Sequence, residues 1–362
     1  MAERGTDPAG AVGTTPTSGG NGAGAGGLYY DEARQFLMVE GVIARGIPTF
    51  PLLPRPKRRN RADGAEGPVP RAAAFDSLGG NTTLGIHLSE VPPGGEKQGH
   101  RHLDEATFYI VSGRGWSELR QDEGKPDQRV DWKAGDVVTI PSNAWHKHYN
   151  ADPDAPALQL AFKNTRFLRK IFHSREFVYQ NDFRFPDRYD DQDDYWTARE
   201  PGNHGKVRVN YIPDVVREPV TPTPDAGEGV GIQRFSMGGH RTIDHALVEI
   251  GVGGRMREHR HLAEEAMLIL AGSGTTHLRT DDGRETTVKW NAGDLVSPPF
   301  QVWREHRQTG HAPVRYLRIQ NNFIERALGV KGNTSIDGAF PDRWPAVIEA
   351  DRSSFVAGNE NG

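Results

Sequence analysis

Short runs of alternating hydrophobic and polar residues fill the middle of the chain. Between residues 71 and 162 they include Leu84-Gly-Ile-His-Leu88, Phe108-Tyr-Ile-Val111 and Val137-Val-Thr-Ile140, separated by glycine, proline, aspartate and asparagine. A period of two residues with turn formers between the segments is typical of antiparallel strands. The same pattern returns between residues 230 and 321. We therefore predict an all-β protein with two similar β-domains.

The two β-regions repeat each other's turn and motif residues at a nearly constant spacing. Gly94, His100 and Gly113 recur 159 residues later, and after the loss of one residue the offset becomes 158; the matched pairs are Gly94/Gly253, His100/His259, Gly113/Gly272, Gly135/Gly293, Pro141/Pro299, Trp145/Trp303 and His148/His306. A steady offset over so many residues indicates an internal duplication.

The segments outside the repeats have other compositions, and they suggest six regions. Residues 1–27 contain almost no large side chains and are predicted to be a disordered tail. From Leu28 to about Arg45 the pattern predicts an amphipathic helix capped by Asp31. The predicted organisation is a tail (1–27), a helical arm and basic loop (28–66), barrel 1 (67–163), a linker with a helix at Thr165–Phe177 and an acidic, solvated loop at 187–194 (164–225), barrel 2 (226–324) and a C-terminal arm (325–362).

Charge and composition point to a small-molecule partner. A net charge of -4 gives no global attraction to nucleic acid or to an anionic membrane. The apolar run at residues 266–271 is too short to cross a bilayer. Since the chain has no cysteine, any metal must be bound through nitrogen and oxygen. We expect a cytoplasmic protein that binds neither nucleic acid nor membrane and forms a homo-oligomer.

Each repeat carries a His-x-His pair. His100 and His102 form the first, and His259 and His261 form the second. Residues two apart on a strand face the same side, where two imidazoles can hold one metal ion. The sequence therefore indicates two candidate metal pockets.

At these residues the chain resembles the cupin superfamily, and specifically its bicupins. The first cupin motif is matched by Gly94, His100, His102 and Gly113, and the second by Gly135, Pro141, His146 and Asn150. The resemblance implies two antiparallel jelly-roll barrels, each with a ligand site in its mouth.

The two copies depart from the family pattern in opposite ways. The motif's glutamate position falls on Ala106 in the first copy and on Glu265 in the second, while Glu105 should face away from the metal. We therefore predict a first site made by His100, His102 and His146. In the second copy Arg304 stands where the third histidine belongs, and we expect it to pair with Glu265 or a bound anion. The predicted remnant of the second site is His259, His261, Glu265, Arg304 and His306.

A three-histidine site without glutamate resembles that of the gentisate and salicylate ring-cleaving dioxygenases. That resemblance implies Fe(II), dioxygen and a small hydroxylated aromatic or enolisable acid. His148 should share the face of His146, either as the acid/base residue or as a hydrogen-bonding neighbour of the ligands. The arginine that holds the substrate carboxylate in those enzymes is missing, because Thr107 and Phe108 follow Ala106; Arg101, Arg114 and Arg120 are possible replacements.

Two other functions fit the same sequence. One is a metal-dependent cupin isomerase, decarboxylase or hydrolase that uses Mn, Ni or Zn, because a ligand set alone does not fix the metal. The other is a bicupin that binds a small ligand without catalysis.

Overall fold

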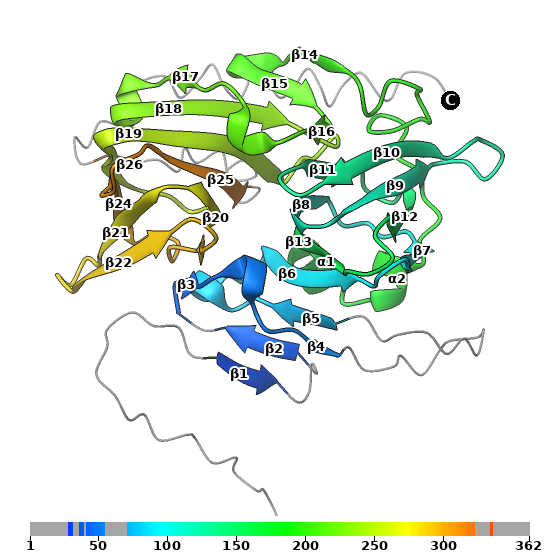
Figure 1. Cartoon of the computed structure of the whole chain (residues 1–362), viewed down its shortest axis with the longest axis horizontal. Helices are drawn as coiled ribbons and strands as arrows, with labels where there is room; N and C mark the ends of the chain where they lie inside the picture. Colours follow the sequence, from blue (N-terminus) through cyan, green and yellow to red (C-terminus); the bar gives the residue numbers. More distant parts are fainter. Residues whose placement is uncertain (1–27, 32–35, 40, 55–70, 323–333, 336–362) are drawn as a thin grey trace, which may run out of the picture.

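The computed structural model describes residues 28–31, 36–39, 41–54, 71–322 and 334–335, and two β-barrels lie side by side in it (Figure 1). The predicted tail at 1–27, the basic loop at 55–61 and most of the C-terminal arm lie outside the described residues. The all-β expectation is confirmed, since the strands form three sheets. None of the described helices is long and apolar enough to span a membrane.

The first barrel is a sandwich of two antiparallel sheets. One has the order β5-β6-β13-β8-β11 and the other β10-β9-β12-β7. The strands are β5 (Arg71–Ala74), β6 (Gly85–Val91), β7 (Glu96–His100), β8 (Ala106–Ser112), β9 (Arg114–Arg120), β10 (Gln128–Lys133), β11 (Val137–Ile140), β12 (Trp145–Asn150) and β13 (Ala157–Lys163).

The second barrel repeats this arrangement with one difference. Its long strand β19 corresponds to both β6 and β7 of the first barrel. The first part of β19 pairs with β25, and its last part pairs with β24. The strands are β18 (Gly227–Ser236), β19 (Ile243–Arg260), β20 (Glu264–Ala271), β21 (Ser273–Arg279), β22 (Glu285–Asn291), β23 (Leu295–Val296), β24 (Trp303–Gln308), β25 (Val314–Asn321) and β26 (Thr334–Ser335).

Repeated glycines end equivalent strands in both copies. Gly113 and Gly272 have φ values of 83° and 77°. A Cβ atom would lie 2.7 Å from the Ala157 side chain at the first position and 2.5 Å from the Pro313 carbonyl oxygen at the second. Only glycine tolerates both the left-handed backbone and this contact, which explains why the spacing of the duplication is preserved.

The predicted N-terminal helix is wrong. Residues 28–44 contain strands instead, namely β1 (Leu28–Asp31), β2 (Phe36–Val39) and β3 (Ile43–Ala44), followed by β4 (Leu53–Pro54). β2 and β4 both pair with β5 and extend the sheet of the first barrel. The segment is rich in aromatic and β-branched residues, which favour strands. Pairing at a sheet edge stabilises it, whereas a short helix without tertiary packing is only marginally stable in water.

The linker between the barrels folds onto the first barrel. The predicted helix is present as α1 (Thr165–Phe172) and α2 (Arg175–Tyr179), interrupted by His173 in a left-handed conformation. The acidic loop is not a solvated linker, because Tyr189 and Tyr195 are buried and the Asp191 carboxylate accepts bonds from two backbone amides of the first barrel. Short strands β14 (Arg199–Pro201), β15 (Lys206–Val209), β16 (Tyr211–Ile212) and β17 (Thr221–Pro222) complete it.

Each barrel is completed by the segment that precedes the other barrel. β3, which comes before the first barrel, pairs with β23 of the second, and β16, which comes before the second barrel, pairs with β11 of the first. One hydrophobic core therefore contains residues of both repeats, among them Leu88 and Leu247. This exchange fixes the two barrels to each other.

Candidate metal centre

Three histidines meet at one end of the first barrel. His100 ends β7, His102 follows it, and His146 lies opposite His100 on the neighbouring strand β12. One ring nitrogen from each lies within 4.8 Å of those of the other two. The structure thus brings together the predicted set His100, His102 and His146, with His100 exposed and the others buried.

Backbone carbonyls orient all three imidazoles in the same way. The Nδ1 atoms of His100, His102 and His146 lie 2.8, 3.2 and 2.9 Å from the carbonyl oxygens of Gln98, Asp104 and Ala144. A carbonyl oxygen can only accept, so each Nδ1 carries the proton and each Nε2 keeps its lone pair. The Nε2 atom of His146 is buried without a hydrogen-bond partner. A divalent cation fits this donor set.

The buried imidazoles are held in the neutral form that a metal requires. Burial, followed by the positive charge of Lys163, holds the pKa of His102 well below its usual value. Burial and the proximity of His100 lower the pKa of His146 in the same direction. Because these imidazoles are already neutral, they bind a metal without first losing a proton.

No glutamate of the described part of the chain joins the three histidines. Ala106 occupies the motif position, and Glu105 points the other way, where its carboxylate accepts bonds from the backbone of residues 241–243 in the second barrel. The prediction that Glu105 faces away from the metal is confirmed. Glu264 of the second barrel makes the equivalent contact with the first barrel, because its carboxylate accepts bonds from the backbone amides of residues 82–84. Both glutamates join the barrels.

Two lysines that sequence reasoning missed lie beside the histidines. The Lys163 Nζ atom is 3.0 Å from His102 Nε2, and Lys97 donates to Ser89 Oγ (2.9 Å) and Gln159 Oε1 (2.6 Å). Both ammonium groups lie within 6 Å of the centre of the Phe108 ring. Two ammonium groups therefore lie beside the histidines even before a metal binds, while the buried carboxylate of Asp104 lies on the Nδ1 side of His102 at 3.9 Å.

The second barrel lacks this polar network. The register of the strands places Met256 at the position of Lys97, Val248 at that of Ser89, Tyr316 at that of Gln159 and Gln320 at that of Lys163. The two interiors share a fold, so the fold itself does not require the ammonium groups. Lys97 and Lys163 could have been found in the sequence by comparing the two repeats, because each lysine stands where the second repeat has an uncharged residue.

The arginines expected to replace the carboxylate clamp lie elsewhere. Arg101 faces Asp182 of the linker at 3.9 Å, and Arg114 is exposed at the start of β9. Arg120 binds Asp127 and stacks on the Trp145 ring at 3.8 Å.

His148 lies inside the barrel next to the three histidines. Its Nδ1 atom is 2.7 Å from Ser117 Oγ, which also accepts a bond from Trp132 Nε1, and its Nε2 is buried without a partner. Burial, followed by the charge of Lys97, holds its pKa well below the usual value. The second barrel repeats this arrangement around His306, whose Nδ1 lies 2.9 Å from Thr276 Oγ1. Part of the His148 environment thus belongs to the barrel architecture.

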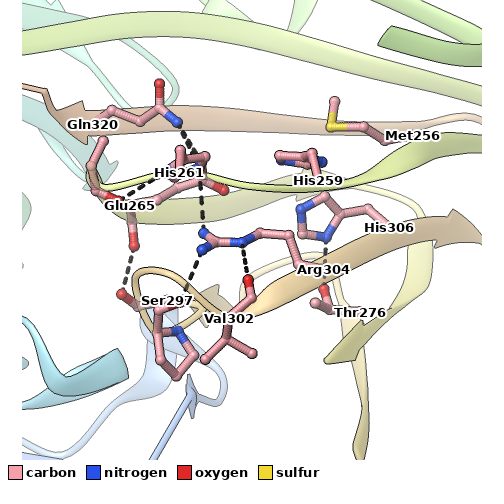
Figure 2. Close-up of polar contacts among 12 residues, drawn as sticks. Met256, His259, His261, Glu265, Thr276, Ser297, Val302, Arg304, His306 and Gln320 are labelled. Atoms are coloured by element: carbon pink, nitrogen blue, oxygen red, sulfur yellow. Dashed lines mark hydrogen bonds and ion pairs between the residues drawn. The ribbon is translucent and has the colours of Figure 1, made fainter. Parts of the chain in front are cut away.

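The remnant site of the second barrel is filled by its own side chains (Figure 2). The Nε2 atom of His261 lies 3.0 Å from Glu265 Oε2, which also accepts a bond of 2.6 Å from Gln320. Although burial opposes it, the bond to His261 and the charges of His261 and Arg304 hold the pKa of Glu265 well below its usual range. Burial lowers the pKa of His259 to about 4 and that of His306 to about 3.

Arg304 lies in the middle of this remnant and is fully buried. Its Nε donates to the Val302 carbonyl (3.2 Å), one terminal nitrogen donates to the Pro299 carbonyl (2.9 Å), and the other lies 3.4 Å from His261 Nε2. Arg304 was expected to pair with Glu265. In the structure it contacts His261, and His261 in turn contacts Glu265.

Comparison with known proteins supports the fold. Residues 87–161 match the family model described as "Cupin domain". An oxalate decarboxylase of Bacillus subtilis, in a mutant form, aligns with a TM-score of 0.50 and 16% identity over 83% of this chain and 80% of that one. The formate complex of the Lactobacillus farciminis enzyme gives 0.51 and 16% over 83% and 89%. No curated protein matches.

The fold and these matches define a two-barrel protein of the cupin fold. The predicted fold of two cupin barrels is confirmed. The likeness to gentisate and salicylate dioxygenases is not shown by these matches.

Proposed function

We propose that the first barrel is the active site of a metal-dependent enzyme that decarboxylates a small organic acid. The observation that carries this proposal is the pair of ammonium groups, on Lys97 and Lys163, beside three neutral histidines. A half-buried site with two ammonium groups, and with no carboxylate among the described residues that gather at the three histidines, favours an anionic substrate.

The lysines provide what binding of a carboxylate needs. Charge-assisted hydrogen bonds from an ammonium group are stronger than neutral ones, and burial strengthens them further. A divalent ion held by the three histidines would supply Lewis-acid polarisation of the substrate's oxygens. Because His102 Nε2 has one lone pair, the metal and Lys163 compete for it. With a metal in place, Lys163 would give up this contact, and we propose that its ammonium group then binds the carboxylate of the substrate.

Decarboxylation breaks one carbon–carbon bond, releases carbon dioxide and leaves the electron pair on the remaining carbon, which then takes up a proton. His148 is the buried imidazole next to the site, and we propose that its Nε2 atom holds that proton. The similarity of 83% of the chain to two oxalate decarboxylases supports this reaction class. Mn, Ni and Zn are suitable metals alongside Fe, because the ligand set alone does not fix the metal.

One observation favours a second function. Ala106 leaves the metal with three neutral ligands, as in the ring-cleaving dioxygenases that the sequence resembles. An Fe(II) dioxygenase acting on a small hydroxylated aromatic acid is therefore the alternative proposal.

A substrate panel separates these functions. Protein loaded with Mn(II) or, anaerobically, with Fe(II) is mixed with short mono- and dicarboxylic acids and with hydroxybenzoic acids, while carbon dioxide and oxygen are both monitored. We expect carbon dioxide release without stoichiometric oxygen uptake, and its loss on treatment with a chelator. Stoichiometric oxygen uptake with a phenolic acid would establish the dioxygenase instead. A rise in melting temperature without turnover would indicate a binding protein.

Lys163→Gln tests the carboxylate contact, since it installs the residue that the second barrel has at this position. We expect KM to rise about 10- to 100-fold, because a charge-assisted hydrogen bond contributes roughly 1.5–3 kcal/mol. Metal affinity should increase or stay the same, because a competitor for His102 is removed. The exposed Lys133→Gln on β10 is the control. An unchanged KM in Lys163→Gln would argue against the clamp.

His148→Gln tests the proton-transfer role against a matched variant, His306→Gln. Both imidazoles lie at the same position of their barrels and bind a hydroxyl through Nδ1. If His148 moves a proton, kcat falls at least about 100-fold in His148→Gln and is unchanged in His306→Gln. Equal losses of thermal stability with kcat preserved in both would mean that His148 is only structural.

A further inference from the structure

The metal-facing end of the first barrel has a nearly complete counterpart in the second. His259 and His261 keep the orientation of their partners, because their Nδ1 atoms lie 2.8 and 2.9 Å from the carbonyl oxygens of Arg257 and Ala263. Glu265 supplies the carboxylate that the first barrel lost, 3.0 Å from His261. The second barrel therefore keeps three of the four residues of a complete site, but among the described residues only His100, His102 and His146 have their ligand atoms gathered within 4.8 Å of one another.

The fourth position is occupied by Arg304, and its contacts follow those of the missing histidine. In the first barrel the Nδ1 atom of His146 bonds the carbonyl two residues before it, at 2.9 Å. In the second barrel the Nε atom of Arg304 donates to the carbonyl of Val302, also two residues before it, at 3.2 Å. The side chain thus leaves the strand along the same path as the imidazole.

Arginine is longer than histidine, so its cationic end extends further into the barrel. One terminal nitrogen of Arg304 lies 3.4 Å from His261 Nε2, the atom that faces the metal position (Figure 2). A bound metal and this guanidinium would require the same space beside His261 Nε2.

We propose that the guanidinium of Arg304 takes the place of a metal ion in the second barrel, as a built-in cation beside the buried pair of His261 and Glu265. The second barrel is then a latent metal site, and Arg304→His converts it into a working one with three histidines and a glutamate. This inference concerns metal stoichiometry and does not depend on the reaction proposed for the first barrel.

The surroundings of Arg304 argue against its being an anion-binding residue. Two of its nitrogens donate to the carbonyl oxygens of Val302 and Pro299, and the side chain is fully buried. The neighbouring Glu265 carboxylate would repel a second anion. Lys163 differs from Arg304 in its position. It corresponds to Gln320 of the second barrel, so it does not replace a metal ligand, and His146 keeps the ligand position that Arg304 occupies in the second barrel.

Cobalt(II) titration tests the inference, because its visible absorption reports coordination by the protein. The chain with His100→Ala and His102→Ala has no first site, so any remaining cobalt belongs to the second barrel. We expect about one cobalt per native chain and none in this double variant. Adding Arg304→His should restore one cobalt per chain, and adding His259→Ala as well should remove it again. Arg304→Gln on the same background is the control and should bind none.

Two results would overturn the inference. One is a double variant that retains cobalt and loses it on addition of His261→Ala, since Arg304 would then not exclude the metal. The other is a folded Arg304→His variant, judged by circular dichroism and melting, that binds no cobalt. If that variant does not fold, the double variant with native Arg304 still decides, because the inference requires it to bind none.

The cation role has a separate readout. Arg304→Gln should lower the melting temperature, because it removes the buried cation that lies beside the pair of His261 and Glu265. Adding Glu265→Gln to that variant should recover most of the loss. No recovery would show that Arg304 acts by packing alone.

Discussion

His100→Ala should remove the metal and the activity together. The side chain is exposed, so its loss leaves no cavity in the core, and the expected effect comes from the lost ligand alone. We expect metal content to fall from about one ion per chain to nearly none, and kcat/KM to fall at least about 1000-fold, because the metal supplies several kcal/mol of transition-state stabilisation. Metal analysis by mass spectrometry and steady-state kinetics provide the measurements.

The duplication supplies a matched control for this experiment. His259→Ala removes the equivalent histidine from the second barrel, where no metal is expected. It should leave the metal content and kcat/KM unchanged. Zinc or iron in both barrels of the native protein, or a loss of metal in His259→Ala equal to that in His100→Ala, would contradict the assignment of a single centre.

Glu105→Ala should cause the largest loss of stability. The Glu105 carboxylate is 2% exposed, and it accepts bonds from the amides of Arg241, Thr242 and Ile243 and from the Thr242 hydroxyl. Its removal leaves these buried donors without an acceptor. We expect the free energy of unfolding to fall by about 3–5 kcal/mol. Urea unfolding monitored by fluorescence measures it.

Glu264→Ala is the counterpart on the other barrel and should cost a similar amount, since Glu264 binds the backbone of residues 82–84 in the same way. At a temperature where both variants are folded, each should retain the metal of the first barrel. If Glu105→Ala instead lost the metal while keeping its stability, Glu105 would be a ligand and the strand-parity argument would fail.

The ligand set of the first site could be predicted because it depends on local order. His100 and His102 are two residues apart, so a strand places them on one face. The missing carboxylate was predicted for the same reason, since Ala106 and Glu105 must face opposite sides. Where a position is fixed by counting along one strand, the sequence is sufficient.

The two lysines could not be assigned in this way. Lys97 and Lys163 lie on β7 and β13, in different sheets of the barrel. Their common contact with Phe108 exists only after the barrel closes. The N-terminal strands were missed for a related reason, because β2 is stabilised by pairing with β5, more than 30 residues away along the chain.

The sequence by itself determined the duplication, the all-β fold, the three histidines and the loss of one ligand from each copy. These features follow from periodicity and from the turn geometry that glycine permits. The tertiary structure decided that each barrel is completed by the other's leading segment, that two ammonium groups line the first site, and that Arg304 lies against His261 in the second. Those features depend on contacts between strands far apart in sequence, and only the closing of the barrels determines such contacts.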